Sequence, residues 1–320
     1  MQTNTRVAVT IFVACCLGLT LLSAQTSKKK TAPKSKTTTA AKAKARADSI
    51  AVAAKADSVR KVATVKAIAD STPKAAADSA RLFRWRKIDT KAYTVGERLV
   101  FDVSYGPITA GEAIMAIPRY ETIAGRNTYR VEFSVNSLPS FDWIYTVRDK
   151  YLTFVDVEAI APLRFEQHIR EATYKRDFIA DFDQANHVAR TSEGNYPIPE
   201  YVHDIMSAFY YARTLSYAGM KPGDYVTLYN FYKDKSHELK VKFLGRQELE
   251  VEAGTFNTVV VEPLVKEGGL FKAEGRIVIW LTDDERKIPI RVNTKVVIGS
   301  IDVELREYHG LNGPLKSRIK

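Results

Sequence analysis

His203, Asp204 and Ser207 come closest to a reactive set in this sequence, because an imidazole, a carboxylate and a hydroxyl can together carry out nucleophilic catalysis. They fall at the start of a predicted helix, where neighbouring residues point in different directions. Asp204 could therefore not orient His203 while Ser207 attacks a substrate. A carboxylate at a helix start instead accepts hydrogen bonds from the first N–H groups of the helix. We interpret Asp204 as a cap and expect no nucleophilic catalysis here.

Other residues with chemical potential are isolated. Asp283 and Asp284 resemble a pair for acid–base work or calcium binding, but they lie between two apolar stretches and indicate a hairpin turn. Motifs of the Gly-x-Ser-x-Gly, Gly-Lys-Ser/Thr and His-Glu-x-x-His types do not occur in the sequence. The histidines are scattered singly, without the spacing of a metal site: His168, His187, His203, His237 and His309. The sequence therefore predicts no catalytic residues, no metal site and no cofactor.

Bulky apolar side chains occur in two segments where connectors are expected, Leu138–Tyr145 and Gly268–Lys272. They could fold back and plug the end of a barrel. Alternatively, they form the apolar mouth of a cavity, or a surface that touches lipid or a partner. For the second case we predict a ligand-binding set made of Phe141, Trp143, Tyr145, Tyr210, Tyr211, Leu270 and Phe271.

A helix predicted over Val202–Gly219 must position part of this set. Its apolar residues recur at helical spacing and form one stripe: Ile205, Ala208, Phe209, Ala212 and Leu215. Asp204 is expected to cap the helix, and Gly219 to end it before a turn. A single helix of this kind usually covers the open face or mouth of an antiparallel sheet.

On both sides of the helix the pattern is typical of β-strands. Leu99, Phe101, Val103 and Tyr105 alternate with other residues, and every second residue of Tyr174–Phe182 shares one face. Roughly a dozen such segments with short turns and no βαβ rhythm predict a mainly β protein. We expect a strongly curved antiparallel sheet, a half-barrel or barrel-like, with one principal helix. Two packed half-sheets are the alternative.

The predicted domain order is a signal peptide at residues 1–24, a spacer at 25–87, the β domain at 88–313 and a basic tail at 314–320. Arg6 precedes the apolar run Val7–Leu22, and Leu22-Ser23-Ala24 suits cleavage. A retained membrane anchor is the alternative. Both cysteines, Cys15 and Cys16, fall inside the apolar run, so the cleaved protein would have neither a thiol nor a disulfide.

The positive charge is concentrated in the spacer, which is rich in Lys and Ala and is predicted to be disordered or partly helical. Residues 25–87 carry 17 Lys or Arg against four Asp or Glu, within a chain whose net charge is +11. The β domain is therefore slightly acidic, and we expect it to bind no nucleic acid. The spacer is either a solvated tether or a segment that binds an anionic envelope surface through its lysines.

Four separated stretches carry a family resemblance: Tyr93–Ala116, Val202–Thr214, Val251–Pro263, and Ile279–Val292 followed by Gly299–Leu305. They resemble, in order, the domain-of-unknown-function family 3108 (DUF3108) of exported bacterial envelope proteins. The resemblance implies an exported, mostly β protein and gives no catalytic residues. Its curved sheet crossed by a helix is also similar in fold to periplasmic carriers that shield the acyl chains of lipoproteins.

The leading hypothesis is a non-enzymatic binding module in the periplasm or outer envelope of a Gram-negative bacterium. It would hold an apolar or amphipathic, lipid-like ligand in a groove of the β-sheet. The alternative is a structural envelope protein, tethered by its basic spacer, that binds a protein or a cell-wall partner.

Overall fold

A computed structural model of the chain describes residues 83–265, 275–296 and 299–320. From Trp85 onward these residues belong to one compact unit. None of the helices in these ranges combines the length and the apolar character that a membrane-spanning helix needs. The segments predicted as signal peptide and spacer lie almost wholly outside the described residues.

The unit is built on one antiparallel sheet of fourteen strands. The first eight precede the helix: β1 (Arg98–Tyr105), β2 (Ile108–Ile123), β3 (Arg126–Ser137), β4 (Arg148–Asp156), β5 (Pro162–Glu171), β6 (Tyr174–Asp183), β7 (Val188–Thr191) and β8 (Gly194–Pro197). Six follow it: β9 (Tyr225–Tyr232), β10 (Lys235–Val251), β11 (Gly254–Val265), β12 (Ile277–Thr282), β13 (Pro289–Lys295) and β14 (Ser300–His309).

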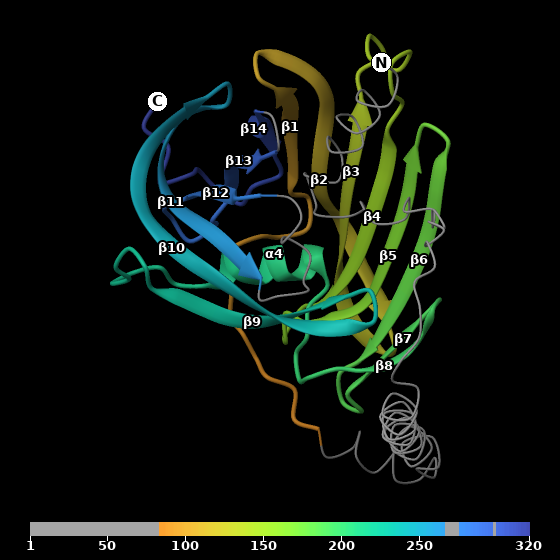
Figure 1. The fold of residues 1–320 in the computed structure, drawn as a ribbon. Helices are drawn as coiled ribbons and strands as arrows, with labels where there is room; N and C mark the ends of the chain where they lie inside the picture. The colour runs from red at the N-terminus through yellow and green to blue at the C-terminus, as the bar shows by residue number, and fades with distance from the viewer. Residues whose placement is uncertain (1–82, 266–274, 297–298) are drawn as a thin grey trace, which may run out of the picture. The chain divides into compact units, whose positions relative to one another are not determined.

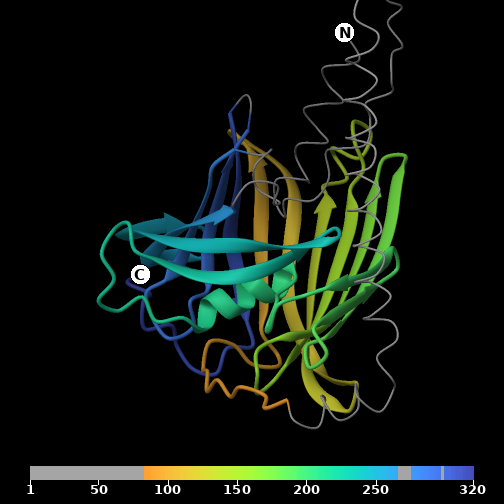
Figure 2. The same cartoon turned by 60° about the horizontal axis from the view of Figure 1, so that its bottom comes forward.

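Strand order explains how the sheet curves. Neighbours in sequence pair with one another, and β1 pairs with β14 in the middle, so that the order runs from β8 through β1 and β14 to β9. Figures 1 and 2 show this sheet bending around the helix α4. Within the described residues β8 and β9 are its two ends, so the sheet is barrel-like but not closed. The prediction of a mainly β, curved antiparallel sheet with one principal helix is confirmed.

The helix α4 spans Ile205–Thr214 and is shorter than the predicted Val202–Gly219. Asp204 caps it as predicted, with its carboxylate accepting from the N–H groups of Met206 and Ser207. Gly219 was expected to end the helix and does not. The last turn is instead closed at Ala212, whose carbonyl accepts from the N–H of Leu215 over 3.3 Å and from the Tyr217 hydroxyl over 3.1 Å.

Two strand boundaries differ from the sequence prediction. The sequence pattern of Trp143–Val155 is typical of a strand, but residues 139–144 form a turn in which the N–H of Tyr145 donates to the Phe141 carbonyl over 3.0 Å. In the sequence Gly245 indicates a connector between two strands, but β10 runs through it without interruption. The register with β11 shifts between Phe243 and Gly245, so this glycine forms a bulge and not a turn.

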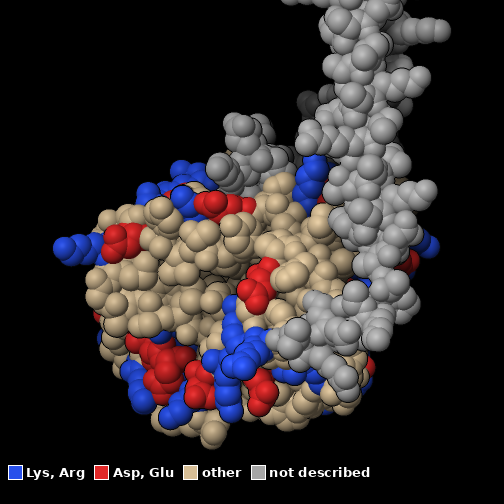
Figure 3. All heavy atoms as spheres, turned by 90° about the horizontal axis from the view of Figure 1, so that it is seen from below, with Lys and Arg blue, Asp and Glu red and all other residues tan. Residues whose placement is uncertain are grey.

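The alternation of residues along the strands separates an apolar inner face from a charged outer face. Every second residue of β6, from Phe178 to Phe182, is buried, as the pattern predicts. The outer face carries cross-strand ion pairs such as Arg306–Asp102 and Arg164–Asp181. Seen from below, basic and acidic side chains lie next to one another (Figure 3). Neither sign of charge forms a continuous field on that face.

Segments at both ends of the described chain pack on the sheet. The guanidinium of Arg86, which falls in the predicted spacer, donates to the carbonyls of Ala159 and Ile160. Near the other end, the predicted basic tail lies along β11. There, the N–H of Ile319 donates to the Thr255 carbonyl over 2.8 Å, and Ser317 is buried.

Candidate apolar ligand site

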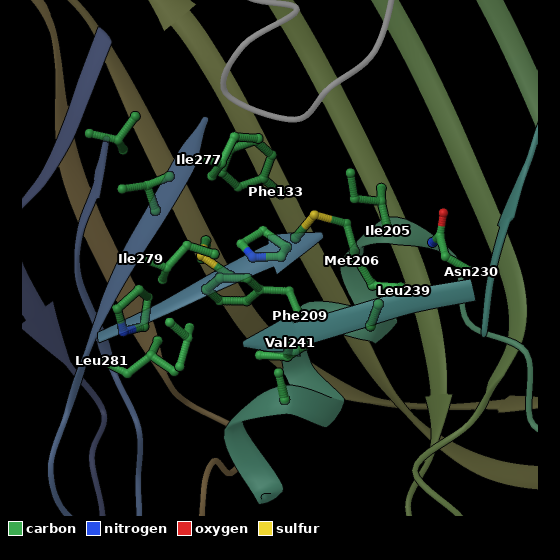
Figure 4. A pocket seen from close by; sticks show the side chains of 18 of the residues that line it. Phe133, Ile205, Met206, Phe209, Asn230, Leu239, Val241, Ile277, Ile279 and Leu281 are labelled. Carbon is green, nitrogen blue, oxygen red and sulfur yellow. The ribbon is translucent and has the colours of Figure 1, made fainter. Parts of the chain in front are cut away.

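An apolar cavity of about 130 Å³ lies between α4 and the inner face of the sheet. Figure 4 shows it from close by, with Phe209 of α4 extending into its centre. Its lining comes from α4 and from strands on either side of β1, and consists of Phe101, Met115, Phe133, Ile205, Met206, Ala208, Phe209, Ala212, Asn230, Leu239, Val241, Val261, Pro263, Ile277, Ile279, Leu281, Pro289, Val292 and Val303. A space of this size and character favours an apolar occupant over water.

Two periodicities in the sequence create this lining. On the helix, Ile205, Ala208, Phe209 and Ala212 are three or four residues apart and therefore lie on one side. On the strands, every second residue faces inward, as Ile277, Ile279 and Leu281 do in β12. Space remains because α4 presents two alanines to strands that carry mainly Val, Ile and Leu.

Among the lining residues, all within the described part of the chain, only Asn230 is polar. Figure 4 places Asn230 at one end of the cavity beside Ile205, and Leu281 toward the other. The side-chain amide nitrogen of Asn230 donates to the His203 carbonyl over 3.2 Å. This hydrogen bond joins β9 to the segment before α4. Apart from this amide, the described lining is apolar, so the site can bury an apolar group.

The helix that forms one wall is fixed by polar contacts. The Arg213 guanidinium donates to both oxygens of the Glu97 carboxylate, over 2.7 and 2.8 Å, with both side chains fully buried. Burial by itself would lower the pKa of Arg213, but the Glu97 carboxylate raises it on balance. At the other end of the helix, the Thr153 hydroxyl donates to the Asp204 carboxylate over 2.7 Å. These contacts hold α4 against β1 and β4.

The residues that suggested a catalytic triad do not form one. Burial, followed by the charge of Arg86, lowers the pKa of His203 to about 3. Its ring stacks on Tyr211 at 4.7 Å, and the Ser207 hydroxyl donates to the backbone carbonyl of Asp204. Groups of three or more potential metal ligands were also not found within residues 83–265, 275–296 and 299–320.

The first three predicted site residues lie in the turn between β3 and β4 and do not line the cavity. Trp143 is 82% exposed, and its indole N–H donates to the Ser140 carbonyl. Phe141 is half-buried in the same turn. The Tyr145 hydroxyl donates to the buried carboxylate of Glu171 over 3.2 Å. The structure brings these three together with one another but not with α4.

The other predicted residues divide into two pairs. Tyr210 is fully buried and lies edge-on to Tyr93 at 4.9 Å, while Tyr211 stacks on His203, so neither lines the cavity. Leu270 and Phe271 lie outside the described residues. Sequence reasoning identified the helix stripe and expected it to cover the mouth of the sheet, but did not include it in the ligand-binding set, and therefore missed the lining. The available signal was the small size of Ala208 and Ala212 within that stripe.

Comparison with family models finds a match to "Protein of unknown function (DUF3108)" over residues 100–306, which contain all the cavity-lining residues. A comparison with the curated proteins gave no match.

Solved structures of similar fold are distant in sequence. One is a beta-barrel-like protein of domain of unknown function DUF1849 from Brucella abortus, with 12% identity, a TM-score of 0.45, and 68% of this chain and 98% of that chain covered. Another, from Bacteroides fragilis and described as an exported protein with a YmcC-like fold, has 13% identity and a TM-score of 0.26, with 70% and 99% covered. These similarities are too distant to carry a functional argument.

Proposed function

The chain belongs to the DUF3108 family, and from its own geometry we propose that it is a non-enzymatic binding module of the cell envelope. It holds an apolar or amphipathic, lipid-like ligand inside the curved sheet. The envelope location, in the periplasm or at the outer membrane of a Gram-negative bacterium, is supported by Arg6 and the apolar run that follows it.

The observation that carries the proposal is the apolar cavity against α4. Removing apolar ligand surface from water contributes about 25 cal/mol per Å², from which the cost of association is subtracted. Met115 and Met206 give the lining side chains that adapt to ligands of varied shape. Binding by burial needs no reactive group, in keeping with the chemistry of the lining.

The direct test is native mass spectrometry of the purified protein, followed by removal of lipid and titration with a fluorescent fatty-acid probe. An Ala212→Phe variant fills the cavity with an apolar ring and should lower probe affinity at least about tenfold. Ala218→Phe is the matched control, because Ala218 is exposed beyond the end of the helix. Absence of co-purified lipid together with absence of probe binding would refute the proposal.

A tethered structural role is the second candidate, favoured by the 17 Lys or Arg in residues 25–87. Deleting residues 25–80 separates the two. A carrier keeps its probe binding after the deletion, whereas a tethered scaffold loses its association with the envelope fraction and binds no probe before or after it.

A further inference from the structure

A second, smaller cavity of about 30 Å³ adjoins the first. It lies between the inner face of β5 and β6 and the strand β9, at the seam where the two ends of the sheet approach each other. Ile205 and Asn230 line both cavities. We call the smaller one the seam cavity. The two shared residues lie beside each other at one end of the apolar cavity (Figure 4).

The seam cavity contains a polar group that the fold does not satisfy. Gln167 on β5 is 1% exposed, and among the described residues its amide nitrogen has no hydrogen-bond acceptor. A buried donor without a partner costs free energy comparable to a lost hydrogen bond. An acceptor group on a ligand in this cavity would remove that cost.

The seam cavity also carries two cations, Arg176 of β6 and Lys233 at the end of β9. One nitrogen of the Arg176 guanidinium donates to Glu193 over 2.8 Å. A guanidinium has five N–H donors, so the same group can serve a second anion. Asp204 lines the cavity too, but its oxygens accept from Thr153 and from the first N–H groups of α4.

We propose that the chain binds a single-chain amphiphile with an anionic headgroup. The carboxylate or phosphate lies at Arg176, Lys233 and Gln167, and the tail passes Ile205 and Asn230 into the apolar cavity. This inference rests on the proposed function.

The test compares ligands that share a ten-carbon tail and differ in headgroup: decanoate, decyl phosphate and decanol. Displacement of a bound fluorescent probe gives each affinity. The two anions should bind about tenfold more tightly than decanol. In the Arg176→Gln variant, the ratio of anion affinity to decanol affinity should fall toward one, while the affinity for decanol stays unchanged. Arg119→Gln, at an exposed position on β2, is the matched control and should keep the ratio.

A second variant tests the role of Arg176 in the opposite direction. Glu193→Gln releases the guanidinium from its carboxylate partner and should tighten decanoate binding about threefold, again without changing decanol. Equal affinity for decanol and the anions, or an anion preference that survives Arg176→Gln, would overturn the headgroup assignment. Probe displacement by inorganic phosphate alone would also overturn it, since the anion would then bind without a tail. Failure of every ten-carbon ligand to bind would instead refute the proposed function.

Discussion

The two halves of the sheet interior differ in how they are filled. Along β3–β6, aromatic side chains form a continuous row in which Phe133, Tyr151, Phe165 and Phe178 follow one another at 6.1–6.4 Å between ring centroids. Along β10–β12, the inward residues that line the apolar cavity are aliphatic. We call these the filled half and the cavity half, although the small seam cavity reaches Phe165 and Phe178 at the β9 side of the filled half. Both have the same backbone pattern.

The difference shows that side-chain size, and not strand geometry, decides where space remains inside the sheet. The filled half also contains buried carboxyl groups, Asp149 and Glu171, whereas the lining of the apolar cavity contains no titratable group within the described residues. On the proposed function, the cavity half holds the apolar part of a ligand, while the filled half contributes stability with its pH dependence and, at the seam cavity, the contacts to the headgroup. The helix α4 contacts both β4 and β9 and forms a wall for each half.

Removing the anchor of this shared wall should have the largest effect. Arg213→Met leaves the Glu97 carboxylate buried without a partner, which should lower the free energy of unfolding by about 3–5 kcal/mol in a urea titration. Arg190→Met breaks an ion pair whose arginine is exposed and should cost less than about 1 kcal/mol. Similar losses in the two variants would show that α4 is not held by this pair.

Enlarging an alanine should separate the two halves. Ala180→Leu inserts volume beside the aromatic row, where Ala180 pairs with Phe165, and should cost about 1–3 kcal/mol. Ala212→Leu places the same side chain in the cavity and should leave stability unchanged or slightly higher while weakening probe binding. Thermal unfolding of both variants, with and without probe, measures the contrast. An equal cost at both positions would mean that the cavity half is as tightly filled as the other.

The pH dependence of stability should come from the filled half. Burial, followed by the charge of nearby Asp149, raises the pKa of Glu171 to about 8, well above its value in an unfolded chain. Between about pH 4.5 and 8 the unfolded state ionises while the folded state keeps its proton, so this group makes stability fall as pH rises.

The variant Glu171→Gln keeps a neutral side chain at every pH. It should flatten that fall by about 1–2 kcal/mol between pH 5 and 8, measured by urea titration at each pH. Glu193→Gln, at an exposed turn, is the control and should leave the slope unchanged. Affinity for the neutral decanol should not vary over the same range in either variant, since no titratable residue of the described chain lines the apolar cavity that holds its tail. A slope that Glu171→Gln does not alter would place the titrating group elsewhere.

The fold was largely predictable because its signals are local. Alternation along segments such as Tyr174–Phe182 depends on the pleat of a single strand, and the Asp204 cap depends only on the first turn of the helix. The end of the helix was not predictable, because it depends on Tyr217 and not on Gly219. The Tyr217 hydroxyl bonds to the last turn, and its ring packs on Phe243 of a distant strand. The predicted end of a helix or strand is wrong where a residue from a distant element supplies the contact that ends it.

The site was predictable only in part for the same reason. The stripe of Ile205, Phe209 and Ala212 was visible in the sequence, but whether it is packed or faces a space depends on the side-chain volumes of strands that follow much later. Trp143 suggested a rim because it is aromatic in a connector, yet its turn is fixed locally by the ion pair of Asp142 and Arg148. A cavity between a helix and a sheet cannot be predicted from the sequence of either element alone.

Gly245 gives the test with the smallest expected effect. It asks whether the bulge in β10, a strand of the cavity half, depends on having a glycine at this position. Its φ of 141° is unfavourable for side chains with a Cβ, although a Cβ there would meet no atom within 4 Å. Gly245→Ala should therefore cost about 1 kcal/mol through backbone strain alone. Gln247→Ala, at an exposed position on the same strand, should stay within about 0.5 kcal/mol of the wild type. If Gly245→Ala is equally harmless, the bulge tolerates a side chain, and the curvature of this half is set by its packing on α4.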